Sequence, residues 1–210
     1  MTLELFYPKF PFWRAEVSRL ALYLGGIPFE NRHPSFDEIR AMKERGELPF
    51  GQVPALRVND RTIGQTGAIA RFCGKLSGHY PTDDPLSAAL IDQIIDAATD
   101  ITVSISPTMR EKDPKRKAEM RAELASEVLP RWFGHLSRLL EQNGGSGFFV
   151  GDNLSIADLA IWRLMGWIKG GHLDGIPDTI LNGHPLLEAH YDIVDSIPEI
   201  RQWMADQYGK

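Results

Sequence analysis

The chain has 210 residues, a formal net charge of −5 and 43% hydrophobic residues. This length suits one large domain or two small ones, and the composition excludes a disordered or low-complexity chain. The 23 basic residues do not outnumber the 28 acidic ones, so we expect neither nucleic acid nor an anionic membrane as a partner. The single cysteine, Cys73, excludes an intramolecular disulfide and any cysteine-clustered zinc site, and it favours a reducing, cytoplasmic setting.

Neither a targeting segment nor a membrane span is predicted. The first residues lack the basic start and the long apolar run of a signal peptide. Later apolar runs are broken by charged residues well before the ~20 residues that a bilayer requires. We therefore expect a soluble protein.

Residues 1–80 alternate strand-like and helical patterns, which is typical of an α/β unit. Strands are predicted at residues 3–7, 29–33, 55–59 and 61–65, and a turn at Asn59-Asp60 joins the last two. Helices are predicted at residues 14–24, 36–45 and 66–77, and Gly25-Gly26 ends the first of them.

The pattern changes at the turn-forming segment PTDDP, residues 81–85, after which strand signals disappear. Helices are predicted at residues 86–109, 118–142, 155–168, 185–196 and 198–207. We place a domain boundary here, with an α/β domain at residues 1–82 and an all-helical domain at residues 83–210.

The loop PFGQVP, residues 49–54, directly precedes a predicted strand. A cis Val53-Pro54 bond would turn the backbone of Val53 outward, where its amide and carbonyl could pair with an extended peptide ligand. An ordinary turn with a trans proline is the other interpretation, and spacing alone does not decide between them.

Two helix starts carry polar signals. At Gln65-Thr66 a strand meets a helix, and the Thr66 hydroxyl is expected to cap the helix while its first free amides attract a carboxylate. A purely structural cap is the alternative. Ser155 and Asp158 form a capping box that opens a later apolar helix, and this role is structural.

In this order, the segments resemble the cytosolic glutathione transferase family, most closely the sigma class, which includes the glutathione-dependent prostaglandin D synthases. The resemblance covers nearly the whole chain: a tyrosine ending the first strand, RAE at residues 14–16, PFGQVP, QT at residues 65–66 and the late capping-box helix. It implies a thioredoxin-like amino-terminal domain that binds glutathione. It also implies an all-α helical bundle that supplies most of a hydrophobic-substrate pocket, and a homodimer.

Carried over by position, the resemblance implies a set of glutathione-binding residues. Val53, preceding Pro54, would pair through its backbone with the cysteinyl part of glutathione, and Gln52 would contact the ligand backbone. Gln65 and Thr66 would hold the γ-glutamyl carboxylate.

Three charged residues complete the implied set. Arg14 and Lys43 are candidates for the glycyl carboxylate and the site entrance, although Lys43 is equally well read as a surface charge. Asp100 shares a helical face with Asp92 and Asp96, which by default is a solvated acidic face. The family suggests that Asp100 reaches across the dimer to the γ-glutamyl ammonium of the neighbouring subunit's ligand. No bound metal is predicted.

Chemistry in this family is thiol activation, and the sequence points to Tyr7. Lowering the thiol pKa from ~8.5 by roughly two units takes about 2.7 kcal/mol, which one charge-assisted hydrogen bond of ~1.5–3 kcal/mol can supply. Residues 6–14 hold no Ser, Thr or Cys that could replace the tyrosine.

The sequence departs from the family pattern at two places. The segment PKFPFW, residues 8–13, is bulkier than usual, so Tyr7 is either the catalytic residue or a core tyrosine displaced from the sulfur. Phe10, Phe12 and Trp13 in this segment are candidates to line the hydrophobic-substrate pocket. Ile39 stands where such enzymes often have a tryptophan that contacts glutathione.

The sequence therefore predicts a tyrosine-type glutathione transferase that conjugates the glutathione thiolate to small hydrophobic electrophiles. Glutathione is its co-substrate. A glutathione-dependent isomerase or peroxidase, and a non-enzymatic binding module with the same fold, are the alternatives.

Overall fold

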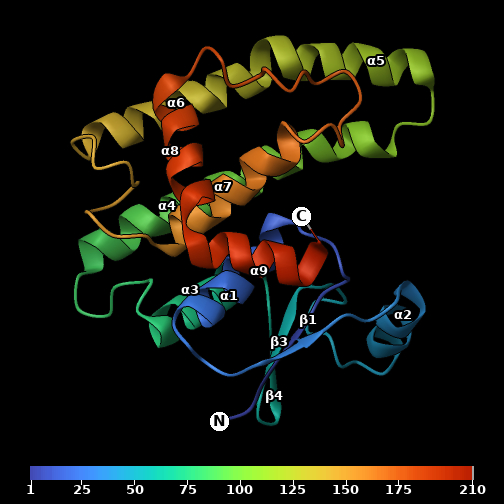
Figure 1. Ribbon diagram of the computed structural model, residues 1–210. Helices are drawn as coiled ribbons and strands as arrows, with labels where there is room; N and C mark the ends of the chain where they lie inside the picture. Colours follow the sequence, from blue (N-terminus) through green and yellow to red (C-terminus); the bar gives the residue numbers. More distant parts are fainter. Residues whose placement is uncertain (210) are drawn as a thin grey trace.

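The computed structural model describes residues 1–209 and consists of a small sheet with its helices and a larger helical part (Figure 1). The first part contains, in chain order, β1 (Leu3–Phe6), α1 (Trp13–Leu24), β2 (Glu30–Arg32), α2 (Phe36–Glu44), β3 (Ala55–Val58), β4 (Arg61–Gly64) and α3 (Thr66–Ser77). The second contains α4 (Pro85–Arg110), α5 (Pro114–Glu123), the π-helical turn η1 (Leu124–Val128), α6 (Leu129–Gln142), α7 (Ile156–Ile168), α8 (Pro185–Ser196) and α9 (Pro198–Tyr208). The predicted fold class is confirmed. The boundary predicted near residue 83 falls between α3 and α4 and stays a prediction.

The sheet has the order β2-β1-β3-β4. β1 runs parallel to β2 through the crossover helix α1, and it pairs antiparallel with β3, which forms a hairpin with β4. Asn59 at the hairpin turn has φ +50°, a conformation that Asn tolerates better than most residues. The predicted turn at this position is therefore confirmed.

The two faces of the sheet pack against different helices because side chains alternate along a strand. Leu3, Leu5 and Leu56 belong to the main core, which also contains α1, α3 and the helical part. Phe6 and Ala55 point to the other face and pack with α2. Helix α7 is buried along almost its whole length and contacts α1 and α4, so it joins the two parts of the molecule.

One helix differs from the prediction. Residues 118–142 were expected to form a single helix. Instead, the helical segment begins at Pro114, and the π-helical turn η1 separates α5 from α6. Asp113 caps the start by accepting a hydrogen bond from the Arg116 amide (2.8 Å), and proline is favoured in the first helical turn.

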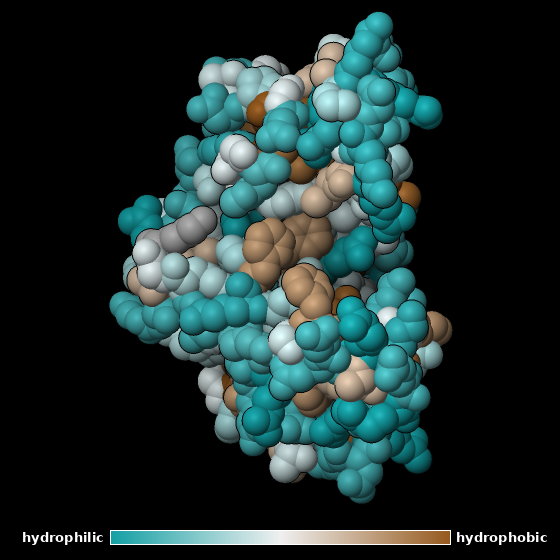
Figure 2. Space-filling view, turned by 90° about the vertical axis from the view of Figure 1, so that its right-hand side faces the viewer, coloured by the Kyte–Doolittle hydropathy of each residue, from teal (hydrophilic) through white to brown (hydrophobic). Residues whose placement is uncertain are grey.

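The face of the molecule in Figure 2 is hollowed at mid-height, and hydrophobic side chains gather there between the helical part and the sheet part. Within residues 1–209, no helix combines the length and the apolar character needed to cross a membrane.

Candidate active site

A cavity of about 490 Å³ lies between the PFGQVP loop, the start of α3 and the middle of α4. Seven of the predicted site residues line it together with six others: Arg14, Phe50, Gln52, Val53, Pro54, Gln65, Thr66, Gly67, Ala68, Arg71, Asp96, Thr99 and Asp100. Of the predicted residues, Tyr7 and Lys43 do not line this cavity. The fold thus brings segments separated by up to 86 positions (14 to 100) to one site.

The loop before β3 presents an unused backbone to the cavity. The Val53-Pro54 bond is cis, which answers the question that the sequence left open. Within the described chain, neither the amide nor the carbonyl of Val53 has a hydrogen-bond partner. Because backbone groups are strong hydrogen-bonding groups, both are available to an extended ligand.

The start of α3 differs from the expected cap. Thr66 is the first helical residue and Gln65 is the N-cap, and no side chain caps this terminus. The predicted capping by the Thr66 hydroxyl is therefore wrong. The first amide of this region that is paired to the backbone is that of Ile69, which donates to the Gln65 carbonyl (3.0 Å).

Three amides, those of Thr66, Gly67 and Ala68, consequently have no partner in residues 1–209, and all three residues line the cavity. Such a terminus carries partial positive charge and attracts an anion. Gln65 has φ +72° and ψ +121°, a strained conformation for a residue with a side chain. Strain of this kind is typical of functional sites.

The charges of the cavity are only partly paired. Arg71 is held by Asp92 (2.6 Å) and Asp96 (3.3 Å). Arg14 is half-buried and Asp100 is exposed, and neither forms an ion pair with another described residue. The cavity therefore offers one free cation and one free carboxylate, which complements a zwitterionic ligand.

Tyr7 directly follows β1 and is partly buried. Its amide donates to the Arg32 carbonyl (3.1 Å), and its own carbonyl accepts from Arg19 Nη2 (3.1 Å). Burial raises the pKa of the Tyr7 hydroxyl to about 12, although the positive charges of Arg14 and Arg19 oppose this shift. The phenol is thus neutral and can donate a hydrogen bond throughout the physiological range.

The bulky segment after Tyr7 mostly turns into the core. Trp13 is fully buried and donates from Nε1 to Thr102 Oγ1 (2.8 Å), while the ring of Phe12 packs edge-on against Trp167 (centroids 4.9 Å apart). Neither residue lines the cavity at the start of α3, and their place in a hydrophobic-substrate pocket stays a prediction. Phe10 is 39% exposed and lies near His172.

Residues near the loop PFGQVP occupy its outer side. Lys43 is exposed on α2, and its aliphatic stem passes Gly51, where a Cβ would lie 3.1 Å from Lys43 Cε. Ile39 packs with the small core that contains Met42 and does not reach the cavity. Phe50 at the cavity rim is 63% exposed.

Sequence reasoning missed Arg71, Asp96 and Thr99 as cavity residues. Asp96 and Thr99 lie on the turns of α4 next to Asp100. The spacing of four residues between the acidic positions indicated that Asp96 shares a helical face with Asp100. Arg71 projects from α3 toward these carboxylates, and only a three-dimensional structure reveals that pairing.

Two structural predictions are confirmed. The Asp158 carboxylate accepts hydrogen bonds from the amide and the hydroxyl of Ser155 (2.8 and 2.7 Å), which forms the predicted capping box. Cys73 is fully buried in α3, and burial raises the pKa of its thiol to about 12. A thiol of this kind packs as an apolar side chain and is not a nucleophile at neutral pH.

Comparison with known proteins decides the family. Residues 1–74 match the model of the glutathione S-transferase N-terminal domain, and residues 99–207 match that of the glutathione S-transferase C-terminal domain. The chain belongs to the glutathione S-transferase family. The predicted resemblance is confirmed, and members of this family use glutathione as co-substrate.

Similar proteins cover nearly the full length. The chain is 30% identical to a glutathione S-transferase of Plasmodium yoelii yoelii (86% of this chain, 80% of the relative) and 30% identical to glutathione S-transferase 1 of Ascaris suum (91% and 90%). Among solved structures, prostaglandin synthase D of Nilaparvata lugens has a TM-score of 0.83 at 26% identity, covering 97% of both chains. The monomeric glutathione S-transferase Na-GST-3 of Necator americanus has a TM-score of 0.81 at 29% identity, covering 98% of this chain and 97% of that one.

The part of the chain that the structure describes contains no group of three or more His, Cys, Asp or Glu side chains placed to hold a metal ion.

Proposed function

We propose that this glutathione S-transferase conjugates the glutathione thiolate to small hydrophobic electrophiles, with Tyr7 as the residue that stabilises the thiolate. The observation that carries the proposal is the convergence, in one cavity, of the unpaired Val53 backbone and the unpaired amides at the start of α3. A tripeptide needs this combination, because it presents an extended backbone and carboxylates.

The ligand is proposed to lie along the cavity with its γ-glutamyl end at α3. Gln65 and the Thr66 amide would hold the γ-glutamyl carboxylate, and Val53 would pair with the cysteinyl backbone beside Gln52 and Pro54. The free carboxylate of Asp100 suits the γ-glutamyl ammonium. In a dimer this contact is proposed to cross to the neighbouring subunit's ligand.

The glycyl end and the sulfur are proposed to lie nearer to Arg14, with Lys43 beside the glycyl carboxylate. The neutral Tyr7 hydroxyl would donate to the thiolate, and a charge-assisted hydrogen bond of ~1.5–3 kcal/mol is the size that a shift of one to two pKa units requires. Arg14 already acts on the Tyr7 hydroxyl electrostatically, so it would also favour the thiolate.

Calorimetric titration with glutathione tests the binding site. We expect Arg14→Gln to weaken binding, whereas Arg131→Gln, at an exposed position on α6, is a charge-matched control that should not. Conjugation of 1-chloro-2,4-dinitrobenzene tests the activity. No binding at millimolar glutathione would refute the proposal and favour a non-enzymatic binding module, an alternative suggested by the bulky segment after Tyr7.

A glutathione-dependent isomerase is the second candidate, favoured by the likeness to the Nilaparvata lugens protein named prostaglandin synthase D. Product analysis with endoperoxide and hydroperoxide substrates separates isomerase and peroxidase activities from conjugation.

We also propose a cytoplasmic homodimer whose subunits each divide into a glutathione-binding domain, 1–82, and a helical domain, 83–210. The exposed side chains of Phe50, Leu86 and Leu90 support an interface beside the cavity, since large exposed apolar residues favour association. Sedimentation of Phe50→Ser, compared with Phe36→Ser at a still more exposed aromatic position on α2, tests it. Only the first variant should dissociate the dimer.

A further inference from the structure

Arg71 lines the proposed glutathione site, but the proposed function gives it no role. It projects from the second turn of α3 and lines the same cavity as Gln65, Thr66 and Asp100. Its side chain is 30% exposed, so it is partly withdrawn from solvent. A charged side chain at such a place either balances its charged neighbours or contacts the ligand. The positions of its three nitrogens distinguish these two roles.

Two carboxylates of α4 fix the orientation of this guanidinium. Nε donates to Asp92 Oδ1 (2.6 Å), and Nη2 donates to Asp96 Oδ1 (3.3 Å). The Tyr80 hydroxyl donates to the same oxygen of Asp92 (3.0 Å), so the carboxylate that makes the shorter bond is itself held in place. Because the group is planar and two of its nitrogens are attached to α4, the direction of the third nitrogen is fixed as well.

The third nitrogen, Nη1, faces the start of α3. It has no hydrogen-bond partner in residues 1–209 and remains accessible to solvent. A Cβ on Gly67 would lie 2.9 Å from Nη1, so the guanidinium occupies the space beside this residue. The backbone of Gly67 has no positive φ that would favour glycine, and glycine is less favourable than alanine in a helix. The close approach of Arg71 therefore explains the glycine at position 67.

Arg71 thus adds a charged donor to the free amides at the start of α3. Helix amides alone attract an anion with partial charge, whereas a guanidinium contributes a full charge and a charge-assisted hydrogen bond. The cavity lining carries two positive and two negative side chains: Arg14, Arg71, Asp96 and Asp100. This balance suits a ligand end that has both a carboxylate and an ammonium.

We propose that Arg71 is a specificity-determining residue, which binds the α-carboxylate of the γ-glutamyl residue through Nη1. The role rests on the proposed function, because it requires glutathione in this cavity with its γ-glutamyl end at α3. It defines a class of co-substrate: thiol peptides that begin with a γ-glutamyl residue and keep its free α-carboxylate. A peptide without this carboxylate leaves Nη1 without an anionic partner.

The test compares glutathione with 4-aminobutyryl-cysteinylglycine, which lacks only the α-carboxylate of the γ-glutamyl residue. Calorimetric titration gives the dissociation constants, and their ratio measures how strongly the protein selects for the carboxylate. Arg71→Gln should lower this ratio at least tenfold, about 1.4 kcal/mol, because it weakens binding of glutathione and leaves binding of the shorter peptide nearly unchanged. An unchanged ratio would overturn the proposal even if both affinities fell, since a structural role affects the two peptides alike.

Two further variants complete the test. Arg71→Lys keeps the charge on a single ammonium group, which we expect to pair with Asp92, so the ratio should fall as in Arg71→Gln. A wild-type ratio with lysine would overturn the assignment of the contact to Nη1. If Arg71→Gln fails to fold, Arg71→Lys decides. Lys75→Gln removes a charge from an exposed position of the same helix and should leave the ratio unchanged; an equal fall there would also overturn the proposal.

The same titrations separate this role from the proposed function. Absence of glutathione binding by the wild type would refute the proposed function and the role of Arg71 together. Binding by the wild type with an unchanged ratio in the Arg71 variants would overturn the role of Arg71 alone.

Discussion

Arg19 Nη2 donates a hydrogen bond to the backbone carbonyl of Tyr7 (3.1 Å) from a fully buried side chain. The same guanidinium forms an ion pair with Glu16 (2.6 Å). The other hydrogen bonds to Glu16 come from α9, through Trp203 Nε1 (2.9 Å) and the Tyr208 hydroxyl (2.5 Å). The end of β1, where Tyr7 lies, is thus attached to the last helix of the chain.

Removing one of these donors should show how much this attachment contributes to the stability of the protein. Tyr208→Phe removes a hydrogen bond to a buried carboxylate, so we expect the free energy of unfolding to fall by ~1.5–3 kcal/mol. Urea unfolding gives the value. Tyr23→Phe is the control, because the partly exposed Tyr23 has no hydroxyl hydrogen bond within the described residues; a loss of the same size there would show that the effect is not specific to Glu16.

Tyr7→Phe should raise the pKa of enzyme-bound glutathione by one to two units, because the thiolate loses its hydrogen-bond donor. The pH dependence of kcat/KM for the electrophile, measured at saturating glutathione, reports this pKa. Since the Tyr7 hydroxyl itself has a pKa of about 12, the wild-type profile should show no second inflection below pH 10. An unchanged profile in the variant would remove Tyr7 from the proposed mechanism.

Gln65 offers a comparison of strain and binding. At φ +72° a Cβ is disfavoured, so Gln65→Gly should be more stable than Gln65→Ala by about 1 kcal/mol. Both variants should bind glutathione more weakly than the wild type. Thermal unfolding and calorimetric titration measure the two quantities, and equal stability of Gly and Ala would mean that residue 65 is not strained.

The capping box of α7 should be a major source of stability. Asp158 is fully buried and also accepts from the Phe149 amide (2.9 Å) and contacts His190 Nε2 (3.1 Å). Asp158→Ala leaves several buried donors unpaired, and we expect a loss of at least 3 kcal/mol. Ser155→Ala should cost about 1 kcal/mol. Chemical denaturation would rank the two variants by their free energy of unfolding. A smaller loss of stability for Asp158→Ala than for Ser155→Ala would contradict this account.

The sequence was sufficient for most of the fold, because its elements carry strong local signals. The bounds predicted for the helix at residues 66–77 equal those of α3, where apolar spacing and Gly78 agree. The turn η1 was missed because no residue type in the sequence signals a π-helical hydrogen-bond pattern. The cap was assigned to Thr66 because the hydroxyl suggested it, whereas the strained backbone of Gln65 starts the helix.

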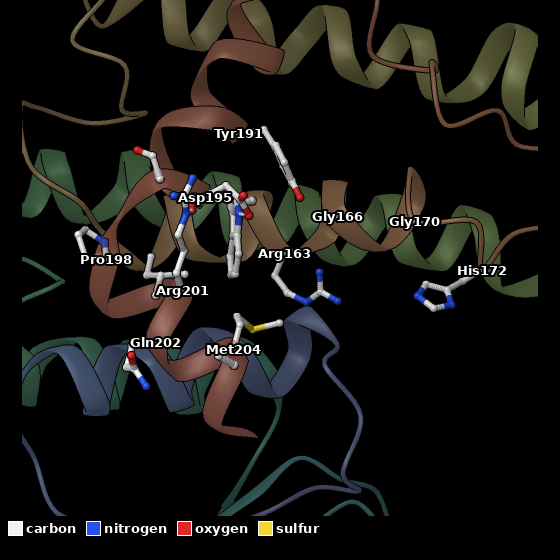
Figure 3. Close-up of a pocket in the computed structure, with 14 residues that line it drawn as sticks. Arg163, Gly166, Gly170, His172, Tyr191, Asp195, Pro198, Arg201, Gln202 and Met204 are labelled. Atoms are coloured by element: carbon white, nitrogen blue, oxygen red, sulfur yellow. Dashed lines mark hydrogen bonds between the residues drawn. The ribbon is translucent and has the colours of Figure 1, made fainter. Parts of the chain in front are cut away.

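The cavity formed by α7, α8 and α9 (Figure 3) could not be predicted from the sequence, for a different reason. Arg163 shares the otherwise apolar helix α7 with one other charged residue, Asp158. The surroundings of Arg163 in the cavity are contributed by residues of α8 and α9 that lie 28 to 42 positions later (191 to 205). A charge inside a fully buried helix, followed by glycine three residues on, was the signal available in the chain.

Cys73 should not react with 5,5′-dithiobis(2-nitrobenzoate) in the native protein, because it is buried and its thiol pKa is raised to about 12. One thiol per chain should appear on unfolding. Cys73→Ala should retain conjugation activity. Fast labelling of the native protein would contradict the burial and reopen a role for this thiol.

Because the only native thiol is buried and unreactive, the chain is suited to site-specific labelling. A cysteine introduced at an exposed position, such as Lys75 on α3, would carry a spin label or fluorophore without first removing Cys73 from the core. Distances between two such labels in solution would then report how two subunits face each other, with the native packing of α3 left untouched.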